Sequence, residues 1–111
     1  MNLEIIRERF LRDNFEKRLG ALAANLARIS SFSRGTPNPK IIKRLLEESK
    51  FFIEWTLLEA PLSLQEKLVE LQVRLAVWCC RLNEGKDGLE NLARESEEWS
   101  EQILSASGLG H

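Results

Sequence analysis

The sequence predicts an all-α protein: an antiparallel, up-down-up-down four-helix bundle with a long first helix. Two apolar rows support this, Leu64, Leu68, Leu71, Leu75, Trp78 and Leu82, then Leu89, Leu92, Ser96, Trp99 and Ile103. Their period near 3.5 residues places each row on one side of a helix that is buried against other helices. Short breaks between the helical segments make consecutive helices antiparallel neighbours.

The first helix is predicted over residues 3–32. Gly20, Ala23 and Ala27 lie beside its apolar row, and such small residues let a neighbouring backbone approach closely. Gly20 is also where the helix is expected to bend if it is not continuous, since glycine is unfavourable by about 1 kcal/mol relative to alanine in a helix interior. The apolar row itself consists of Leu11, Phe15, Leu19, Leu22, Leu26 and Ile29.

The second helix is predicted over residues 39–59. Gly35 suits the left-handed position that ends a helix, and Asn38 before Pro39 suits an N-cap followed by a first-turn proline. Pro61 ends the second helix, because the residue before a proline avoids helical geometry. Its expected core residues are Ile42, Leu45, Leu46, Phe52, Ile53 and Leu57.

The third and fourth helices are predicted over residues 64–82 and 88–105, with a frayed tail at 106–111. Ser63 with Glu66, and Asp87 with Glu90, have the spacing of a capping box, in which two residues satisfy each other's free backbone N–H groups.

Composition indicates one domain over residues 1–111. The chain has 43% hydrophobic and 30% charged residues, which suits a single modest core with a helical surface. No apolar run approaches the roughly 18 residues that span a bilayer, and the N-terminal residues mix charges, unlike a signal peptide. We therefore expect a cytoplasmic protein that does not enter the membrane.

Charge is unevenly distributed along the chain. Residues 1–50 hold 11 Lys and Arg against 6 Asp and Glu, a balance of +5, and residues 51–111 hold 5 against 11, a balance of −6. This predicts complementarity between neighbouring helices or, alternatively, two faces that dock different partners. The near-neutral total argues against general affinity for nucleic acid, which needs many phosphate contacts.

The sequence offers few groups for catalysis. His111 is the one histidine, so the usual histidine-containing nucleophile, metal and haem sites cannot be assembled. Cys79 and Cys80 are neighbours that point about 100° apart on a helix, and we expect Cys79 to be buried near the core. The three tryptophans are expected in the core and not in one ligand cage. No catalytic residue, metal or cofactor is predicted, and no small-molecule substrate is identified.

One short motif suggests a magnesium site. Glu97, Glu98 and Glu101 have a Glu-Glu-x-x-Glu outline that resembles that of all-α nucleotide pyrophosphatases. The resemblance covers five residues and implies a magnesium-dependent nucleotide hydrolase. The second acidic pair of that pattern is missing here, and surface glutamates flanking a buried Trp99 are the simpler interpretation.

The length of the first helix suggests an interface. At 1.5 Å per residue it would be about 45 Å long, against about 30 Å for the others, so its start would overhang the bundle. Apolar side chains on an overhang need a partner, which predicts a homodimer or larger assembly. The alternative is a bend that folds these residues back. The candidate interface residues are Leu3, Ile6, Phe10 and Leu11.

A basic cluster surrounds the start of the second helix, where free N–H groups attract anions. Its residues are Arg34, Lys40, Lys43 and Arg44. The leading hypothesis is nevertheless a small, cytoplasmic, non-enzymatic bundle that acts by protein–protein interaction or self-association. A nucleic-acid or anion-binding module is the alternative, and a glutamate-based magnesium hydrolase is the third.

Overall fold

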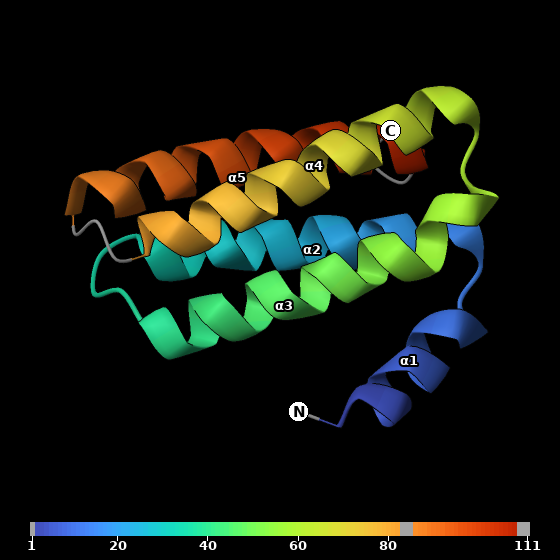
Figure 1. Cartoon of the computed structure of the whole chain (residues 1–111), viewed down its shortest axis with the longest axis horizontal. Helices are drawn as coiled ribbons and strands as arrows, with labels where there is room; N and C mark the ends of the chain where they lie inside the picture. Colours follow the sequence, from blue (N-terminus) through green and yellow to red (C-terminus); the bar gives the residue numbers. More distant parts are fainter. Residues whose placement is uncertain (1, 83–85, 109–111) are drawn as a thin grey trace.

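A computed structural model describes residues 2–82 and 86–108 (Figure 1). Its elements are all helical: α1 (Leu3–Arg12), α2 (Phe15–Ser33), α3 (Pro39–Thr56), a short 3-10 helix η1 (Leu57–Glu59), α4 (Leu62–Arg81) and α5 (Lys86–Ser107). No strand occurs in the described ranges, which confirms the all-α prediction. The helices pack together, and the most extensive contact is the one between α2 and α5.

Side-chain hydrogen bonds link α2 to the α3–η1 segment, α2 to α5, and α4 to α5. Residue numbers rise along one helix as those of its linked partners fall along the other, and Figure 1 shows the same reversal at each connection. The linked pairs are Arg18 with Glu59 and Asn25 with Glu48 between α2 and α3, Ser30 with Ala93 and Ser100 with Ala23 between α2 and α5, and Lys67 with Gln102 and Arg74 with Glu95 between α4 and α5.

The prediction of one continuous first helix is wrong. The helix breaks at Asp13 and Asn14, six residues before Gly20, which remains inside α2. Asn14 has extended backbone geometry, and its side-chain oxygen accepts a 2.9 Å hydrogen bond from the backbone N–H of Lys17. An asparagine in this position caps a new helix, so the chain turns here instead of at the glycine.

Arg18 holds this corner together. Its guanidinium donates to the backbone oxygens of Leu11 and Asp13, at 3.2 and 2.9 Å, and so satisfies carbonyl groups left free at the end of α1. The same side chain is only 11% exposed and forms a 2.7 Å ion pair with Glu59 of η1. One arginine therefore links the break between α1 and α2 to the end of the α3 segment.

The break lets α1 fold back, so the predicted overhang does not form. Phe10 is buried and stacks on Phe52 of α3, with ring centroids 4.2 Å apart. Trp55 completes the aromatic cluster, 5.8 Å from Phe10. Burying these rings removes the apolar surface that an overhanging helix would expose.

The turn between α2 and α3 agrees with the sequence. Gly35 has a φ of +64°, the left-handed geometry that glycine adopts without strain. Asn38 caps α3 by accepting from the N–H of Ile41, with Pro39 in the first turn. The predicted start of α4 is wrong, because the helix begins at Leu62 with Pro61 in the cap position and no side-chain cap. Proline's fixed φ favours that earlier start.

The remaining boundaries differ by one or two residues. α5 begins at Lys86, before Asp87, so the predicted cap at Asp87 is also wrong. The helix continues to Ser107, so the tail expected to fray at 106–111 is helical at its start, and residues 109–111 lie outside the described part. The proposed end of the third helix at residues 83–85 lies outside it too.

The two apolar rows form the core as predicted. On α4, the side chains of Leu68, Leu71 and Trp78 are fully buried. On α5, those of Leu92, Ser96 and Ile103 are fully buried too. Trp99 is buried as well, and Trp55 is half-buried and packs against the core. Leu11, expected in the core row of the first helix, is exposed because the chain turns after Arg12.

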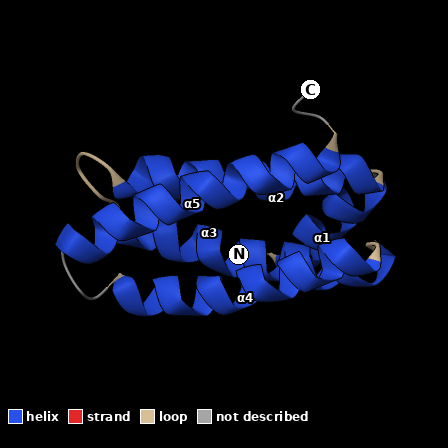
Figure 2. Cartoon of the chain, turned by 90° about the horizontal axis from the view of Figure 1, so that it is seen from above, coloured by secondary structure: helices blue, strands red, loops and turns tan. Residues whose placement is uncertain are grey.

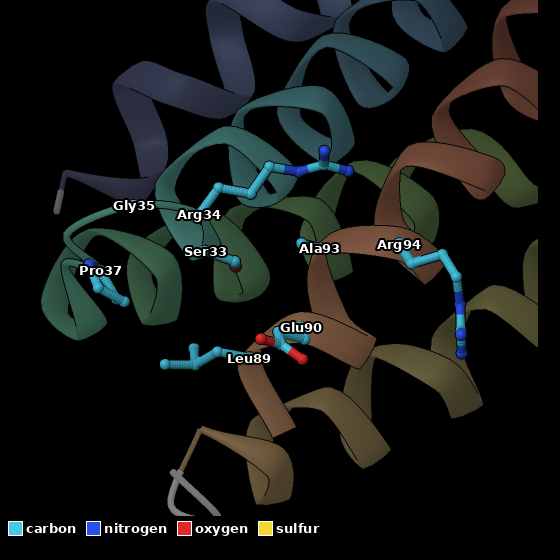
Figure 3. A pocket seen from close by; sticks show the side chains of 8 residues that line it. All are labelled: Ser33, Arg34, Gly35, Pro37, Leu89, Glu90, Ala93 and Arg94. Carbon is cyan, nitrogen blue, oxygen red and sulfur yellow. The ribbon is translucent and has the colours of Figure 1, made fainter. Parts of the chain in front are cut away.

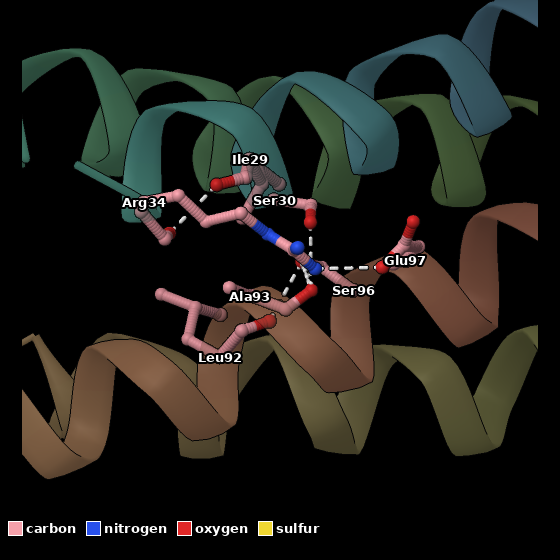
Figure 4. A network of polar contacts seen from close by, with 8 residues as sticks. Ile29, Ser30, Arg34, Leu92, Ala93, Ser96 and Glu97 are labelled. Atoms are coloured by element: carbon pink, nitrogen blue, oxygen red, sulfur yellow. Dashed lines mark hydrogen bonds and ion pairs between the residues drawn. The ribbon is translucent and has the colours of Figure 1, made fainter.

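The contact between α2 and α5 depends on small side chains. The hydroxyl of Ser30 on α2 donates to the carbonyl of Ala93 on α5 at 2.7 Å (Figure 4). The hydroxyl of Ser100 on α5 donates to the carbonyl of Ala23 on α2, also at 2.7 Å. A serine hydroxyl reaches a carbonyl of a neighbouring helix only if the two backbones are close. The small residues noted around Ala23 thus mark the helix pair with the closest approach.

We expect Ser30→Leu to lower the free energy of unfolding by about 2 kcal/mol, because the larger side chain forces α2 and α5 apart. Ser31→Leu is the matched control, since Ser31 is the next residue and is exposed, and it should change stability by less than about 0.5 kcal/mol. Urea unfolding followed by circular dichroism measures both. Equal effects of the two substitutions would contradict the close approach.

We expect Phe10→Ala to release α1 from α3. Losing a buried phenylalanine costs about 3 kcal/mol, which raises the local opening constant of α1 roughly a hundredfold. Hydrogen–deuterium exchange should therefore speed up in residues 3–12 while α2 and α5 keep their protection. Leu11→Ala, at a neighbouring exposed position, should leave α1 protected, and slow exchange in both variants would show that the aromatic stack does not hold α1.

Candidate functional site

α4 is apolar on two opposite sides. One side carries the buried row of the core, and the other carries exposed apolar side chains. At about 100° per residue, the exposed positions 62, 69, 73, 76 and 80 fall within a sector of about 60° that faces away from the core row. With Leu58 of η1, which precedes α4, they form what we call the outer stripe: Leu58, Leu62, Val69, Val73, Ala76 and Cys80.

The outer stripe holds much of the exposed apolar surface of the molecule. Leu58 is 91% exposed, Leu62 71%, Val69 48% and Val73 58%, and these are four of the eight large apolar side chains that are exposed among the described residues. A groove of about 410 Å³ follows the start of the stripe, between Leu58, Leu62 and Val69. Figure 2 shows that α4 lies along an edge of the molecule.

Leaving such a row of apolar side chains in contact with water is unfavourable. A contiguous exposed apolar patch rimmed by polar residues is typical of a surface that binds another protein. Covering a fully exposed leucine contributes about 2 kcal/mol, so Leu58 and Leu62 alone represent a substantial driving force for association. The sequence does contain a pattern for this stripe, because apolar residues stand at positions 62, 69 and 76, seven residues apart. The core row on the same helix is longer and has larger side chains, so it dominates the pattern.

The C-terminal half of α4 is fixed to α5 by an acidic side chain. Glu95 of α5 forms ion pairs with both Arg74 and Arg81 of α4, and all three side chains are less than one-third exposed. Lys67 adds a 3.4 Å contact to Gln102 nearer the start of α4. These links orient the helix, so the outer stripe keeps a fixed direction.

Cys79 and Cys80 both lie on the surface, which corrects the expectation that Cys79 is buried. Partial burial raises the pKa of the Cys79 thiol, and Cys80 and Glu47 raise it further against the opposing effect of Lys43 and Lys50. The Cys79 thiol is therefore mostly protonated at neutral pH and a weak nucleophile. Within residues 2–82 and 86–108, no group of three His, Cys, Asp or Glu side chains is placed to hold a metal ion.

The structure separates the four candidate interface residues on α1. Phe10 is buried, and Ile6 is half-buried where it packs against the core. Leu3 is half-buried, and Leu11 is 36% exposed. The apolar surface that the sequence analysis placed on α1 is thus used largely within the chain, against α3.

The structure also disperses the basic cluster. Arg34 forms a 2.6 Å ion pair with Glu97 (Figure 4), whereas Arg44 lies beside the groove under α1 with Phe10 and Phe52. Lys43 lies near Cys79 on the side of α3 that faces α4. Lys40 is exposed at the start of α3. The four cations do not converge on one anion.

A wide cleft lies between the α2–α3 turn and α5. It has a volume of about 720 Å³ and is lined by Ser33, Arg34, Gly35, Pro37, Leu89, Glu90, Ala93 and Arg94 (Figure 3). The Arg34 guanidinium is paired with Glu97, and the Arg94 side chain extends away from the other lining residues and donates to Asn91. The carboxylate of Glu90 remains in the lining, so the cleft does not favour an anion.

The three glutamates of the pyrophosphatase-like motif have different surroundings in the structure. Glu97 is paired with Arg34 and Glu101 lies beside them in a shallow cleft, while Glu98 is exposed near Lys67. A magnesium site needs several carboxylates directed at one point. The described residues do not provide that arrangement.

Comparison with known proteins yields no relative: no family model, curated protein or solved structure matches the chain. Among the described helices, none combines the length and apolar character that crossing a membrane requires.

We expect Glu95→Gln to lower the free energy of unfolding by about 2 kcal/mol, because two partly buried arginines lose their ion pair. Glu97→Gln removes the exposed pair with Arg34, in which both side chains are 55% exposed, and should cost less than about 0.5 kcal/mol. Urea midpoints of the two variants give the comparison. A larger loss from the Glu97 variant would be inconsistent with α4 being fixed through Glu95.

Proposed function

We propose that this protein is a non-enzymatic helical bundle that binds a protein partner along the outer stripe of α4. The observation that carries the proposal is the second apolar side of α4, with Leu58 and Leu62 almost wholly in water. The partner that fits this surface is an amphipathic helix, because a helix laid along α4 would cover a stripe of side chains spaced by turns.

The bundle supplies a rigid base for such contact. We take α2, α3, α4 and α5 to form an antiparallel four-helix bundle, with α1 as an additional helix packed on α3. Close packing of α2 with α5, and the ion pairs of Glu95, support a fixed position for α4. Cytoplasmic location and action by protein–protein contact remain part of this proposal.

The competing functions have less support. Anion or nucleic-acid binding at Arg34, Lys40, Lys43 and Arg44 would need these cations to act together, and they lie on different parts of the surface. A magnesium hydrolase would need glutamates that converge. Neither surface has a feature comparable with the exposed apolar side of α4.

Photo-crosslinking tests the proposal. Replacing Val69 by p-benzoylphenylalanine should yield a defined adduct on illumination in the cells that produce the protein, and Leu62→Glu in the same chain should weaken binding about tenfold and reduce the adduct accordingly. The control carries the photoreactive residue in place of Ala24, an exposed position on α2. If position 69 gives no more adduct than position 24, the outer stripe is not a binding surface.

A further inference from the structure

We propose that the partner on the outer stripe is the same stripe of a second copy of this chain, with the two α4 helices antiparallel. This inference rests on the proposed function and names the occupant of its surface. It assigns self-association to α4, whereas the sequence alone predicted it for the start of the first helix.

The size of the side chains along the stripe selects the antiparallel arrangement. Large residues, Leu58 and Leu62, lie at the start of the stripe, and small ones, Ala76 and Cys80, lie at its end. Antiparallel pairing can place Leu62 of one copy against Cys80 of the other, a large side chain against a small one, which keeps the distance between the helix axes even. Parallel pairing would oppose leucine to leucine at one end and leave a gap between the small residues at the other.

The spacing of the stripe also permits a two-fold axis. If Leu62 of one copy faces Cys80 of the second, then Val69 faces Val73 of the second copy, because each pair sums to the same number. Each contact occurs twice, as a closed, isologous dimer requires. The axis passes at the level of residue 71, the middle of α4.

The charges beside the stripe favour the same orientation. Glu66 and Glu70, in the first half of α4, are exposed and form no ion pair with another described residue. The second half of α4 carries no acidic residue, and although its Arg74 and Arg81 are already paired with Glu95, the exposed Lys43 and Lys50 of α3 lie near Cys79 and supply free positive charge. Antiparallel pairing brings each acidic half toward a basic half, whereas parallel pairing would bring like charges together.

Disulfide mapping between two single-cysteine chains tests the orientation. One chain carries Leu62→Cys with Cys79→Ser and Cys80→Ser, and the other carries only Cys79→Ser and so keeps Cys80. After equimolar mixing and mild oxidation, mass spectrometry should find mainly the mixed disulfide between positions 62 and 80. The two positions lie about 27 Å apart along one helix, so a predominance of 62–62 and 80–80 links would overturn the antiparallel arrangement.

Light scattering on the unmodified chain tests the dimer itself. The chain should be dimeric at high concentration, and Val69→Glu and Val73→Glu should each weaken the dimer at least about tenfold without changing the thermal unfolding of the monomer. Ile5→Glu is the matched control, because Ile5 is 47% exposed but lies on α1. If Ile5→Glu disperses the dimer and Val69→Glu does not, the interface is on α1 and this inference is wrong.

The outcomes separate this inference from the proposed function. A monomeric chain whose photoreactive residue at position 69 links to a different protein would overturn the homodimer and leave the binding surface in place. A monomeric chain with no adduct at position 69 would overturn both. Adducts between two copies of this chain, joined near the two α4 helices, would support both.

Discussion

The close approach of α2 and α5 determines how the remaining helices are arranged. Ser30 and Ser100 can reach carbonyl groups of the opposite helix only because small residues line this contact. α2 also packs on α3, so it is enclosed by two neighbours, and α4 lies against α3 and α5. This position leaves one side of α4 at the edge of the molecule. The apolar character of that side follows from the sequence, but its exposure follows from the packing.

The second constraint is length. A continuous first helix would be longer than the bundle, and its apolar start would stay in water. The break at Asp13 and Asn14 resolves this by folding α1 onto α3, where Phe10 stacks on Phe52. Arg18 makes the turn possible because it binds the carbonyls at the end of α1 and the carboxylate of Glu59. The surface first expected to mediate association is therefore largely consumed within the chain.

Polar groups in this protein serve mainly to position helices. Glu95 binds two arginines of α4, and the Arg34–Glu97 pair links the end of α2 to α5. Through the second of these pairs, Arg34 of the basic cluster already has a carboxylate partner. The uneven charge of the two halves of the chain is partly used in this way, by arginines before residue 50 that pair with glutamates after it. Charge is also uneven within α4, because its glutamates lie in its first half and its arginines in its second half.

The sequence by itself determined the all-α class, the two buried rows, the turn at Gly35 and the cap at Asn38. These depend on local periodicity and backbone preference, which act over a few residues. It did not determine where the first helix breaks, because the gain that favours the break comes from rings 42 residues apart, Phe10 and Phe52. Nor did it reveal which apolar residues stay exposed. An apolar side chain is buried or free according to the neighbours that tertiary packing supplies, and for α4 only the folded structure shows that its second side has none within the described chain.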